Sequence, residues 1–276
     1  MVPADLLEIA EALVPDARIG SARLADMGNM HHVVLLPGVA AVRITKRPSS
    51  AAEMPRRVEK LRAIASAGLP FAVPEPLTPV TTFGERTAVA ISWIDGDGLP
   101  EGSGDPAAFA ELFEALREAE ITPELKAVLH VPQRYADGTG WAEILDDVVP
   151  ELPLKWRDQV RRGVDVLLEL DEVPPRLVHG DLGGPNVHFG EDGKLVGVLD
   201  WDLATLYDPA IDAALVASWH GWDVLRGAVD DETYRRAQAW HNSVGAEHLH
   251  AVLAGKPLAY GAGFVSSVVA WLEATE

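Results

Sequence analysis

One segment in the second half of the chain constrains the fold more than any other. It runs from Leu177 to Asp202 and contains Asp181, Asn186 and Asp200 in that order. An Asp followed five residues later by an Asn has the spacing of a kinase catalytic loop, where the Asp accepts the hydroxyl proton and the Asn binds Mg²⁺. A later carboxylate completes the oxygen ligands that Mg²⁺ prefers. The pattern predicts phosphoryl transfer to a hydroxyl, with Asp181 as catalytic base and Asn186 and Asp200 as metal ligands.

A hairpin is expected between the two metal ligands. Residues 187–189 and 194–199 are typical of short strands, and the Gly-Glu-Asp-Gly sequence at 190–193 is typical of the turn between them. An Asp-rich hairpin is also compatible with a solvated turn, but the order and spacing of the three polar residues favour the catalytic interpretation. Only seven residues separate Asp200 from Asp208, which is expected to cap a new helix. That length excludes the activation segment and peptide-docking platform of a protein kinase, so the predicted acceptor is a small molecule.

These residues resemble the aminoglycoside phosphotransferase family of bacterial antibiotic kinases, and within it the likeness is greatest to enzymes that act on viomycin and capreomycin. The resemblance rests on 179–184 with Asn186, on 198–202, on 208–210 with Asp212, and on 30–34 and 69–77. It implies an α+β, bilobal protein-kinase-like fold. A β-rich N-lobe over 1–95 would bind the nucleotide, and a mainly helical C-lobe over 96–276 would hold the catalytic loop and the acceptor.

Candidate nucleotide-binding residues lie in the N-terminal region. A turn containing Gly28 and Asn29 has backbone N–H groups suited to cradle phosphates, although an ordinary hairpin is equally compatible. In a kinase the next strand carries a lysine that contacts the phosphates and pairs with a helix glutamate. Here Arg43 occupies that place, Lys46 is the other candidate, and Glu59 is the expected ion-pair partner. The alternative is that both basic residues are solvated charges at the strand end.

The stretch 91–96 resembles the hinge of the family, where main-chain groups pair with the adenine edge. This resemblance implies that Ser92 and Ile94 contact the nucleotide. The chain has no Gly-x-x-x-x-Gly-Lys-Ser/Thr sequence, which excludes a Walker-type phosphate loop.

Periodicity predicts the surrounding elements. Helices are expected over 3–14, 51–67 and 154–170, and strands over 32–36, 39–45 and 87–93. The predicted core face of the third helix consists of Trp156, Val160, Val164, Leu167 and Leu168.

Several further residues have more than one interpretation. Asp202 is a candidate for substrate binding, with a second metal ligand and a solvated strand end as alternatives. The resemblance implies that Asp212 braces the catalytic loop, and His179 is expected to order it by hydrogen bonding. Four tryptophans either wall a substrate pocket or belong to the core: Trp141, Trp219, Trp222 and Trp240.

The charge distribution limits the partners. The chain has 276 residues, a net charge of −19 and no cysteine. Residues 1–95 contain 10 acidic and 10 basic residues, whereas the remainder contains 32 acidic and 13 basic residues. Nucleic acid, which needs a positive surface, is excluded as a partner, and a cationic substrate is favoured, although acidic surfaces also serve solubility. The apolar run 261–272 is too short to span a membrane, so we expect a cytoplasmic enzyme with no evident protein partner.

Together these features predict an O-phosphotransferase that uses Mg²⁺ and ATP, or GTP. Its expected substrate is a small cationic antibiotic, either a tuberactinomycin peptide such as viomycin or capreomycin or an aminoglycoside, and its activity would confer resistance. One alternative is a macrolide or small-metabolite kinase of the same fold. Another is a regulatory pseudokinase that binds nucleotide, against which the complete set of Asp181, Asn186 and Asp200 argues.

Overall fold

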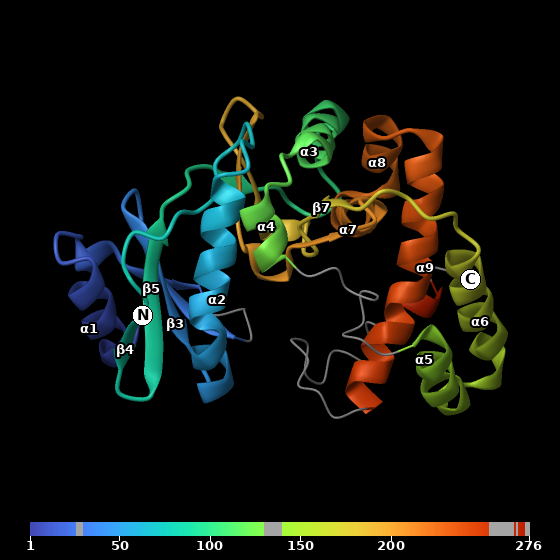
Figure 1. Ribbon diagram of the computed structural model, residues 1–276, viewed down its shortest axis with the longest axis horizontal. Coiled ribbons are helices and arrows are strands. Elements are labelled where there is room, and N and C mark those ends of the chain that lie inside the picture. Colours follow the sequence, from blue (N-terminus) through green and yellow to red (C-terminus); the bar gives the residue numbers. More distant parts are fainter. Residues whose placement is uncertain (26–29, 130–139, 254–267, 269, 274–276) are drawn as a thin grey trace. The chain divides into compact units, whose positions relative to one another are not determined.

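The computed structural model describes residues 1–25, 30–129, 140–253, 268 and 270–273 (Figure 1). The chain forms two compact units. The first comprises Met1–Leu99, Glu118–Leu129 and Pro185–Leu203, and the second comprises Pro100–Arg117, His130–Gly184 and Ala204–Glu276. The lobe boundary expected at residue 95 lies close to the first of these breaks, and the hairpin after the catalytic loop groups with the N-terminal unit.

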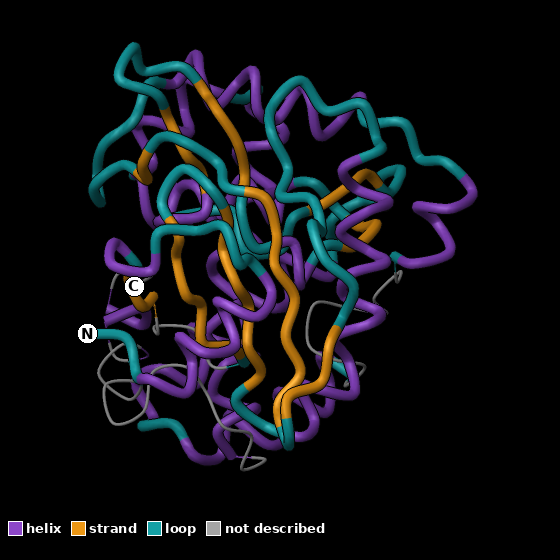
Figure 2. The backbone as a smooth tube through the Cα atoms, turned by 90° about the vertical axis from the view of Figure 1, so that its left-hand side faces the viewer, coloured by secondary structure: helices purple, strands orange, loops and turns teal. Residues whose placement is uncertain are grey.

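An antiparallel sheet of five strands forms the centre of the first unit (Figure 2, orange). Its spatial order is β1 (Arg23–Ala25), β2 (His31–Leu36), β3 (Ala40–Thr45), β5 (Arg86–Ser92) and β4 (Thr81–Phe83). The three predicted strands are confirmed as β2, β3 and β5 with ends shifted by at most one residue. Gly38 lies in the tight turn between β2 and β3 and has a φ of 73°. A residue with a Cβ would adopt this left-handed backbone conformation only under strain.

Alternation along β3 assigns its two faces. Ala40, Val42 and Ile44 pack into a core with α1 (Ala4–Leu13), which contributes Leu6 and Ile9. Because side chains alternate along a strand, the intervening Arg43 points to the opposite face. There its guanidinium approaches α2 (Pro48–Ala65), which begins three residues before the predicted start because Pro48 is well suited to the first helical position.

The first unit also contains a second, smaller sheet. It pairs β6 (Asp97–Gly98) with β8 (Val187–Phe189) and β8 with β9 (Leu195–Val198), so the predicted hairpin is confirmed. Gly96 must remain a glycine, because a Cβ there would lie 2.4 Å from the carbonyl oxygen of Phe189. The remaining elements of this unit are short: η1 (Ile19–Ser21), α4 (Pro123–Val128) and η4 (Trp201–Leu203).

The second unit is mainly helical. Its elements are α3 (Pro106–Glu118), α5 (Trp141–Val148), η2 (Val149–Glu151), α6 (Leu154–Leu168), β7 (Arg176–Val178), η3 (Gly184–Asn186, which reaches into the first unit), β10 (Thr205–Tyr207), α7 (Ala210–His220), α8 (Trp222–Ala228) and α9 (Asp231–Leu253). The long helix α9 packs against α5, α6 and α7 (Figure 1). Four predicted core residues of α6 are buried, but the fifth prediction was wrong: Leu168 is 60% exposed at the end of the helix. No described helix combines the length and apolar character that crossing a bilayer requires.

Candidate active site

The predicted catalytic loop follows β7 in the second unit and is held by α7. Asp212 accepts hydrogen bonds from the main-chain N–H groups of His179, at 2.7 Å, and Gly180, at 2.9 Å. His179 is fully buried, and its Nδ1 accepts the N–H of Asp181 at 3.1 Å. The expected bracing roles of Asp212 and His179 are therefore confirmed. These bonds fix the backbone on both sides of Gly180 and leave the Asp181 residue exposed.

The start of α7 is fixed by the capping residue that the sequence predicted. Asp208 accepts the N–H of Ala210 at 2.9 Å through Oδ1. Its other oxygen accepts from Arg236, at 2.6 Å, and from the indole N–H of Trp240, at 2.9 Å. These two partners lie on α9, about thirty residues further along the chain, so local pattern gave no signal for them. The cap thus links the helix that holds the catalytic loop to the longest helix of the same unit.

The predicted metal ligands lie at one end of the β8–β9 hairpin in the first unit. Val187 pairs with Val198, and the N–H of Leu199 donates to the carbonyl oxygen of Asn186 at 2.8 Å. Asp200 follows directly, half-exposed, with φ 56°. Among the described residues no other non-glycine has a positive φ, and such conformations concentrate at functional sites.

An amide and a carboxylate brought together in this way are hard oxygen ligands, which suit Mg²⁺ supplemented by water and phosphate oxygens. Over the same described part of the chain, no cluster of three or more His, Cys, Asp or Glu side chains has an arrangement that could hold a metal.

A buried charge cluster surrounds Arg43 beside this hairpin. Its guanidinium binds both carboxylate oxygens of Asp202, at 3.0 Å for Oδ1, and lies 3.5 Å from Asp200. Arg57 of α2 also donates to the Asp202 carboxylate, and Lys60 donates to the Asp202 main-chain oxygen at 2.8 Å. Burial alone would raise the pKa of Asp202, but the charges of Arg43 and Arg57 hold it well below its usual range.

Two expectations about this cluster need correction. Glu59 is exposed, and over the described residues the ion pairs of Arg43 are with Asp202 and Asp200, so the expected pair with Glu59 is not formed. The interpretation of Asp202 as a solvated strand end was also wrong, because its side chain is only 14% exposed and is held by two arginines. Arg57 and Lys60 were missed. Their spacing of three residues, which puts two basic groups on one helix face, was the available signal.

The other predicted nucleotide-binding residues have varied surroundings. Lys46 follows β3, and its N–H donates to the Met30 carbonyl at 3.0 Å. Ser92 ends β5 and makes two bonds of 2.8 Å with Glu75, through its N–H and its hydroxyl oxygen. Ile94 is buried, and no hydrogen bond of its main-chain N–H is found among the described residues. Gly28 and Asn29 lie outside the described residues.

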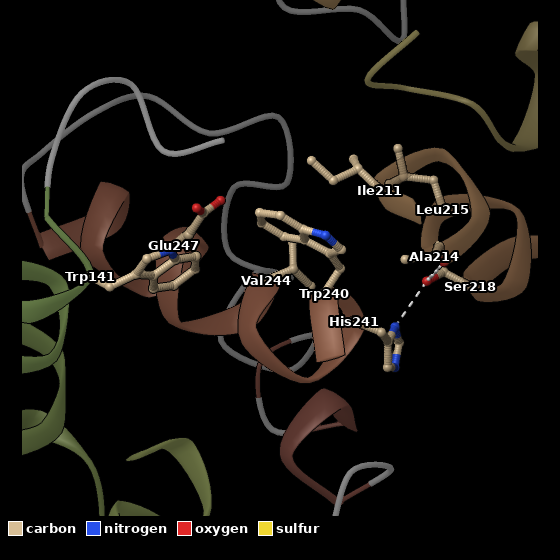
Figure 3. Close-up of a pocket in the computed structure, with 9 residues that line it drawn as sticks. All are labelled: Trp141, Ile211, Ala214, Leu215, Ser218, Trp240, His241, Val244 and Glu247. Carbon is tan, nitrogen blue, oxygen red and sulfur yellow. Dashed lines mark hydrogen bonds between the residues drawn. The ribbon is translucent and has the colours of Figure 1, made fainter. Parts of the chain in front are cut away.

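A pocket opens in the second unit beside α7 (Figure 3). It is lined by Trp141, Ile211, Ala214, Leu215, Ser218, Trp240, His241, Val244 and Glu247. Two of the four candidate tryptophans therefore line a pocket, whereas Trp222 packs edge-on against Tyr234. Leu215 lines the pocket and also lies close to Gly183, which follows Asp181 by two residues. A Cβ placed on Gly183 would lie only 3.2 Å from the Leu215 carbonyl oxygen.

The fold and these residues define the class of protein. An antiparallel sheet followed by a mostly helical part, with a catalytic loop and a hairpin that carries Asn and Asp, is the protein-kinase-like architecture of a phosphotransferase. The chain belongs to the phosphotransferase enzyme family, whose sequence profile matches residues 29–273. The resemblance to aminoglycoside phosphotransferases and the predicted fold class are thereby confirmed.

Individual relatives agree with this assignment. Viomycin phosphotransferase from Streptomyces vinaceus is 32% identical over 79% of this chain and 80% of its own length. Hygromycin-B 4-O-kinase from Escherichia coli is 27% identical over 58% of this chain and 51% of its own length. Among solved structures, the GDP complex of aminoglycoside 2'-phosphotransferase-IIIa superposes with a TM-score of 0.78 over 98% of this chain and 97% of that one, at 18% identity.

Proposed function

We propose that this enzyme transfers the γ-phosphoryl group of ATP or GTP to a hydroxyl of a small cationic antibiotic in the cytoplasm, and so confers resistance. Tuberactinomycin peptides such as viomycin and capreomycin, or aminoglycosides, are the proposed substrates. The observation that carries the proposal is the braced catalytic loop with Asp181, followed by a hairpin that brings Asn186 beside Asp200. The 32% identity to viomycin phosphotransferase supports the substrate class.

Each part of the site has a proposed role. Asp181 orients the acceptor hydroxyl and takes its proton, because it is exposed on a backbone that Asp212 and His179 hold fixed. Asn186 and Asp200 hold Mg²⁺, which when bound neutralises negative charge on the nucleotide phosphates. Arg43 is the basic residue proposed to contact those phosphates, with Lys46 as the alternative.

The remaining nucleotide contacts are proposed from the same resemblance. Gly28 and Asn29 would offer main-chain N–H groups to the phosphates, and Ser92 and Ile94 would lie along the adenine edge. Of these two, Ile94 has the better placed donor, because the N–H of Ser92 is already bonded to Glu75. Residues 1–95 would thus bind the nucleotide, and 96–276 would supply the catalytic loop and the acceptor site.

The pocket in Figure 3 is proposed to receive part of the acceptor. Its aromatic walls, Trp141 and Trp240, provide faces that attract cations, and the Glu247 carboxyl lies among its lining groups. Because α7 contacts both this pocket and the catalytic loop, an acceptor seated there extends along the helix that orders Asp181. A cationic group suits this lining better than an anionic one.

The test is direct detection of the product. Purified enzyme is incubated with Mg²⁺ and either ATP or GTP, together with viomycin, capreomycin, kanamycin or a macrolide, and each acceptor is analysed by mass spectrometry. We expect a gain of one phosphate on a cationic antibiotic, with Asp181→Asn as the inactive control. A gain on the macrolide alone would replace the proposed substrate class. Nucleotide binding without a gain on any acceptor would favour the pseudokinase.

A further inference from the structure

The cluster around Asp202 joins three segments of the first unit. Arg43 lies on β3, Arg57 and Lys60 lie on α2, and Asp202 lies in η4, directly after the hairpin. All four residues are largely buried: the side chains of Arg43, Asp202 and Arg57 are 11%, 14% and 17% exposed. An ion pair at this depth is screened little by solvent, so removing one partner disturbs those that remain.

The helix contributes cations rather than an anion. In a protein kinase the strand lysine pairs with a helix glutamate, whereas here Arg57 and Lys60 both donate to Asp202, through its carboxylate and its main-chain oxygen. Residues three apart lie on the same helix face, and Glu59, next to Lys60 in sequence, is rotated away and exposed. The helix α2 therefore contacts the site through Asp202. Its contact residues are cations, whereas the helix residue of a protein kinase is an anion.

Two buried donors in the cluster remain unused. Arg43 donates to His31 Nδ1 at 3.1 Å, and because a guanidinium is only a donor, the hydrogen of the neutral ring lies on Nε2. That His31 Nε2 and the Arg57 Nε are both buried and have no hydrogen-bond partner among the described residues. Buried donors without partners are costly, so the cluster depends strongly on the hydrogen bonds that it does make.

We propose that Arg57 and Lys60 are positioning residues for Mg-nucleotide binding, acting through Asp202. By holding Asp202 from the helix side, they orient the Arg43 guanidinium, and they fix the segment in which Asp200, two residues earlier, adopts its left-handed backbone conformation. This inference rests on the proposed function, because it assigns the two residues to the same nucleotide site. It replaces the expected strand–helix pair with Glu59 by a coupling through Asp202.

The test compares Arg57→Met with two matched variants. Arg57→Lys retains the positive charge, and Glu53→Gln removes only the exposed partner of Arg57, which lies 2.6 Å away on the same helix. Binding of Mg-ATP and Mg-GTP is measured by calorimetry without acceptor, together with the half-saturating Mg²⁺ concentration and the unfolding temperature. We expect Arg57→Met to weaken nucleotide binding and raise the Mg²⁺ requirement, each on the order of tenfold, as for a lost charge-assisted contact. Arg57→Lys should recover part of this loss, and Glu53→Gln should behave as wild type.

A double-mutant comparison tests whether the effect passes through Asp202. In an Asp202→Asn background, Arg57→Met should cause little further loss of nucleotide binding, because the group through which it acts is already impaired. Lys60→Met gives a second route to the same result if Arg57→Met does not fold. Its binding loss should be smaller, since Lys60 holds the main-chain oxygen and leaves both carboxylate contacts in place.

The outcomes separate this inference from the proposed function. Variants that lose thermal stability but bind Mg-nucleotide like wild type would overturn the positioning role. A full additional loss from Arg57→Met in the Asp202→Asn background would show that Arg57 contacts the ligand directly and would overturn the route through Asp202. A wild-type protein that binds no Mg-nucleotide would overturn both proposals, whereas one that binds it but phosphorylates no antibiotic would leave this test intact.

Discussion

Asp200 and Asp181 are expected to have separable roles in the proposed reaction, although both are acidic residues. Asp200→Asn should abolish Mg²⁺-dependent nucleotide binding, because the amide removes the charge but still tolerates the φ of 56° at this position. Asp181→Asn should leave nucleotide binding nearly unchanged while turnover falls roughly 10²-fold or more, as for a lost general base. Calorimetry and steady-state kinetics measure the two effects, with Asp192→Asn in the exposed hairpin turn as control. Normal binding and turnover in both variants would contradict the assignment.

The two basic candidates differ in their surroundings, which gives a second prediction. Arg43 is buried and ion-paired, whereas Lys46 lies beyond the end of β3. Arg43→Met should raise the nucleotide KM more than Lys46→Met does, by a factor consistent with about 1.5–3 kcal/mol for a charge-assisted hydrogen bond. It should also lower the unfolding temperature, because Asp202 loses its two-point partner. The opposite order of KM values would transfer the phosphate contact to Lys46.

At the scale of residues, the sequence predicted what depends on spacing and missed what depends on packing. The order of Asp181, Asn186 and Asp200 was sufficient to predict a loop and a hairpin. Asn186 follows Asp181 by five residues, and a single turn joins the two short strands between Asn186 and Asp200. The partner of Arg43 could not be chosen in that way. Asp202 lies 159 residues away, and only the packing of α2 beside the sheet brings Arg57 to the same carboxylate.

At the scale of elements, the close approach of α6 and α9 gives a prediction about glycine. A Cβ on Gly163 would lie 2.6 Å from the Asn242 carbonyl oxygen. At an exposed position inside a helix, replacing glycine with alanine normally stabilises the protein by up to about 1 kcal/mol. Forcing an extra methyl group into a closely packed contact typically destabilises it by about 1–3 kcal/mol. Gly163→Ala should therefore lower the unfolding temperature, by about 2–4 °C per kcal/mol lost. Gly20→Ala, where nothing lies within 4 Å of the added Cβ, is the control, and an unfolding temperature raised by Gly163→Ala would show that the helices separate easily.

Periodicity predicted the buried face of α6 but not where that face ends. Trp156, Val160, Val164 and Leu167 are buried as predicted, since residues at this spacing share one side of a helix. Leu168 has the same hydrophobicity, but it is the last helical residue and is turned by one position from Leu167, away from the core. The burial of the last residue of a helix depends on which other element covers it. The hydrophobic periodicity of the sequence does not contain that information.

At the scale of the whole molecule, buried histidines predict a loss of stability in acid. Burial lowers the pKa of His31, to about 3, and it also lowers the pKa values of His220, His241 and His248. A base with a lower pKa when folded binds fewer protons than in the unfolded chain, so stability falls as the pH drops below the unfolded pKa of about 6.5. Asp212 and Asp200 act in the opposite direction, because burial raises the pKa of Asp212 to about 7 and raises that of Asp200 above its usual value, but they are two groups against four.

We therefore expect the unfolding temperature to decrease between pH 7.5 and pH 5. His220→Asn provides the check, since the asparagine amide can replace the Nδ1–H that donates to the Ser103 carbonyl at 2.6 Å. This variant should show a shallower decrease over the same range, because one titrating group has been removed. An unchanged slope would mean that His220 does not contribute to the acid sensitivity.

The last prediction concerns the net charge of −19, all of which arises after residue 95, where 32 acidic residues stand against 13 basic ones. If this field attracts the acceptor, kcat/KM for a polycationic antibiotic should fall steeply with NaCl, as the Debye length shortens from about 10 Å at 0.1 M to about 3 Å at 1 M. Individual exposed pairs contribute only about 0–1 kcal/mol, so the summed field, rather than one carboxylate, would produce the effect.

The KM for Mg-nucleotide should change less over the same salt range, because its proposed partner Arg43 is only 11% exposed and buried charges are screened weakly. Steady-state kinetics with viomycin and with an uncharged acceptor, from 0.05 to roughly 1 M NaCl, measure both dependences. A salt-independent kcat/KM for the polycation, or a preference for the uncharged acceptor, would show that the acidic surface serves solubility, and the charge argument for a cationic substrate would then no longer hold.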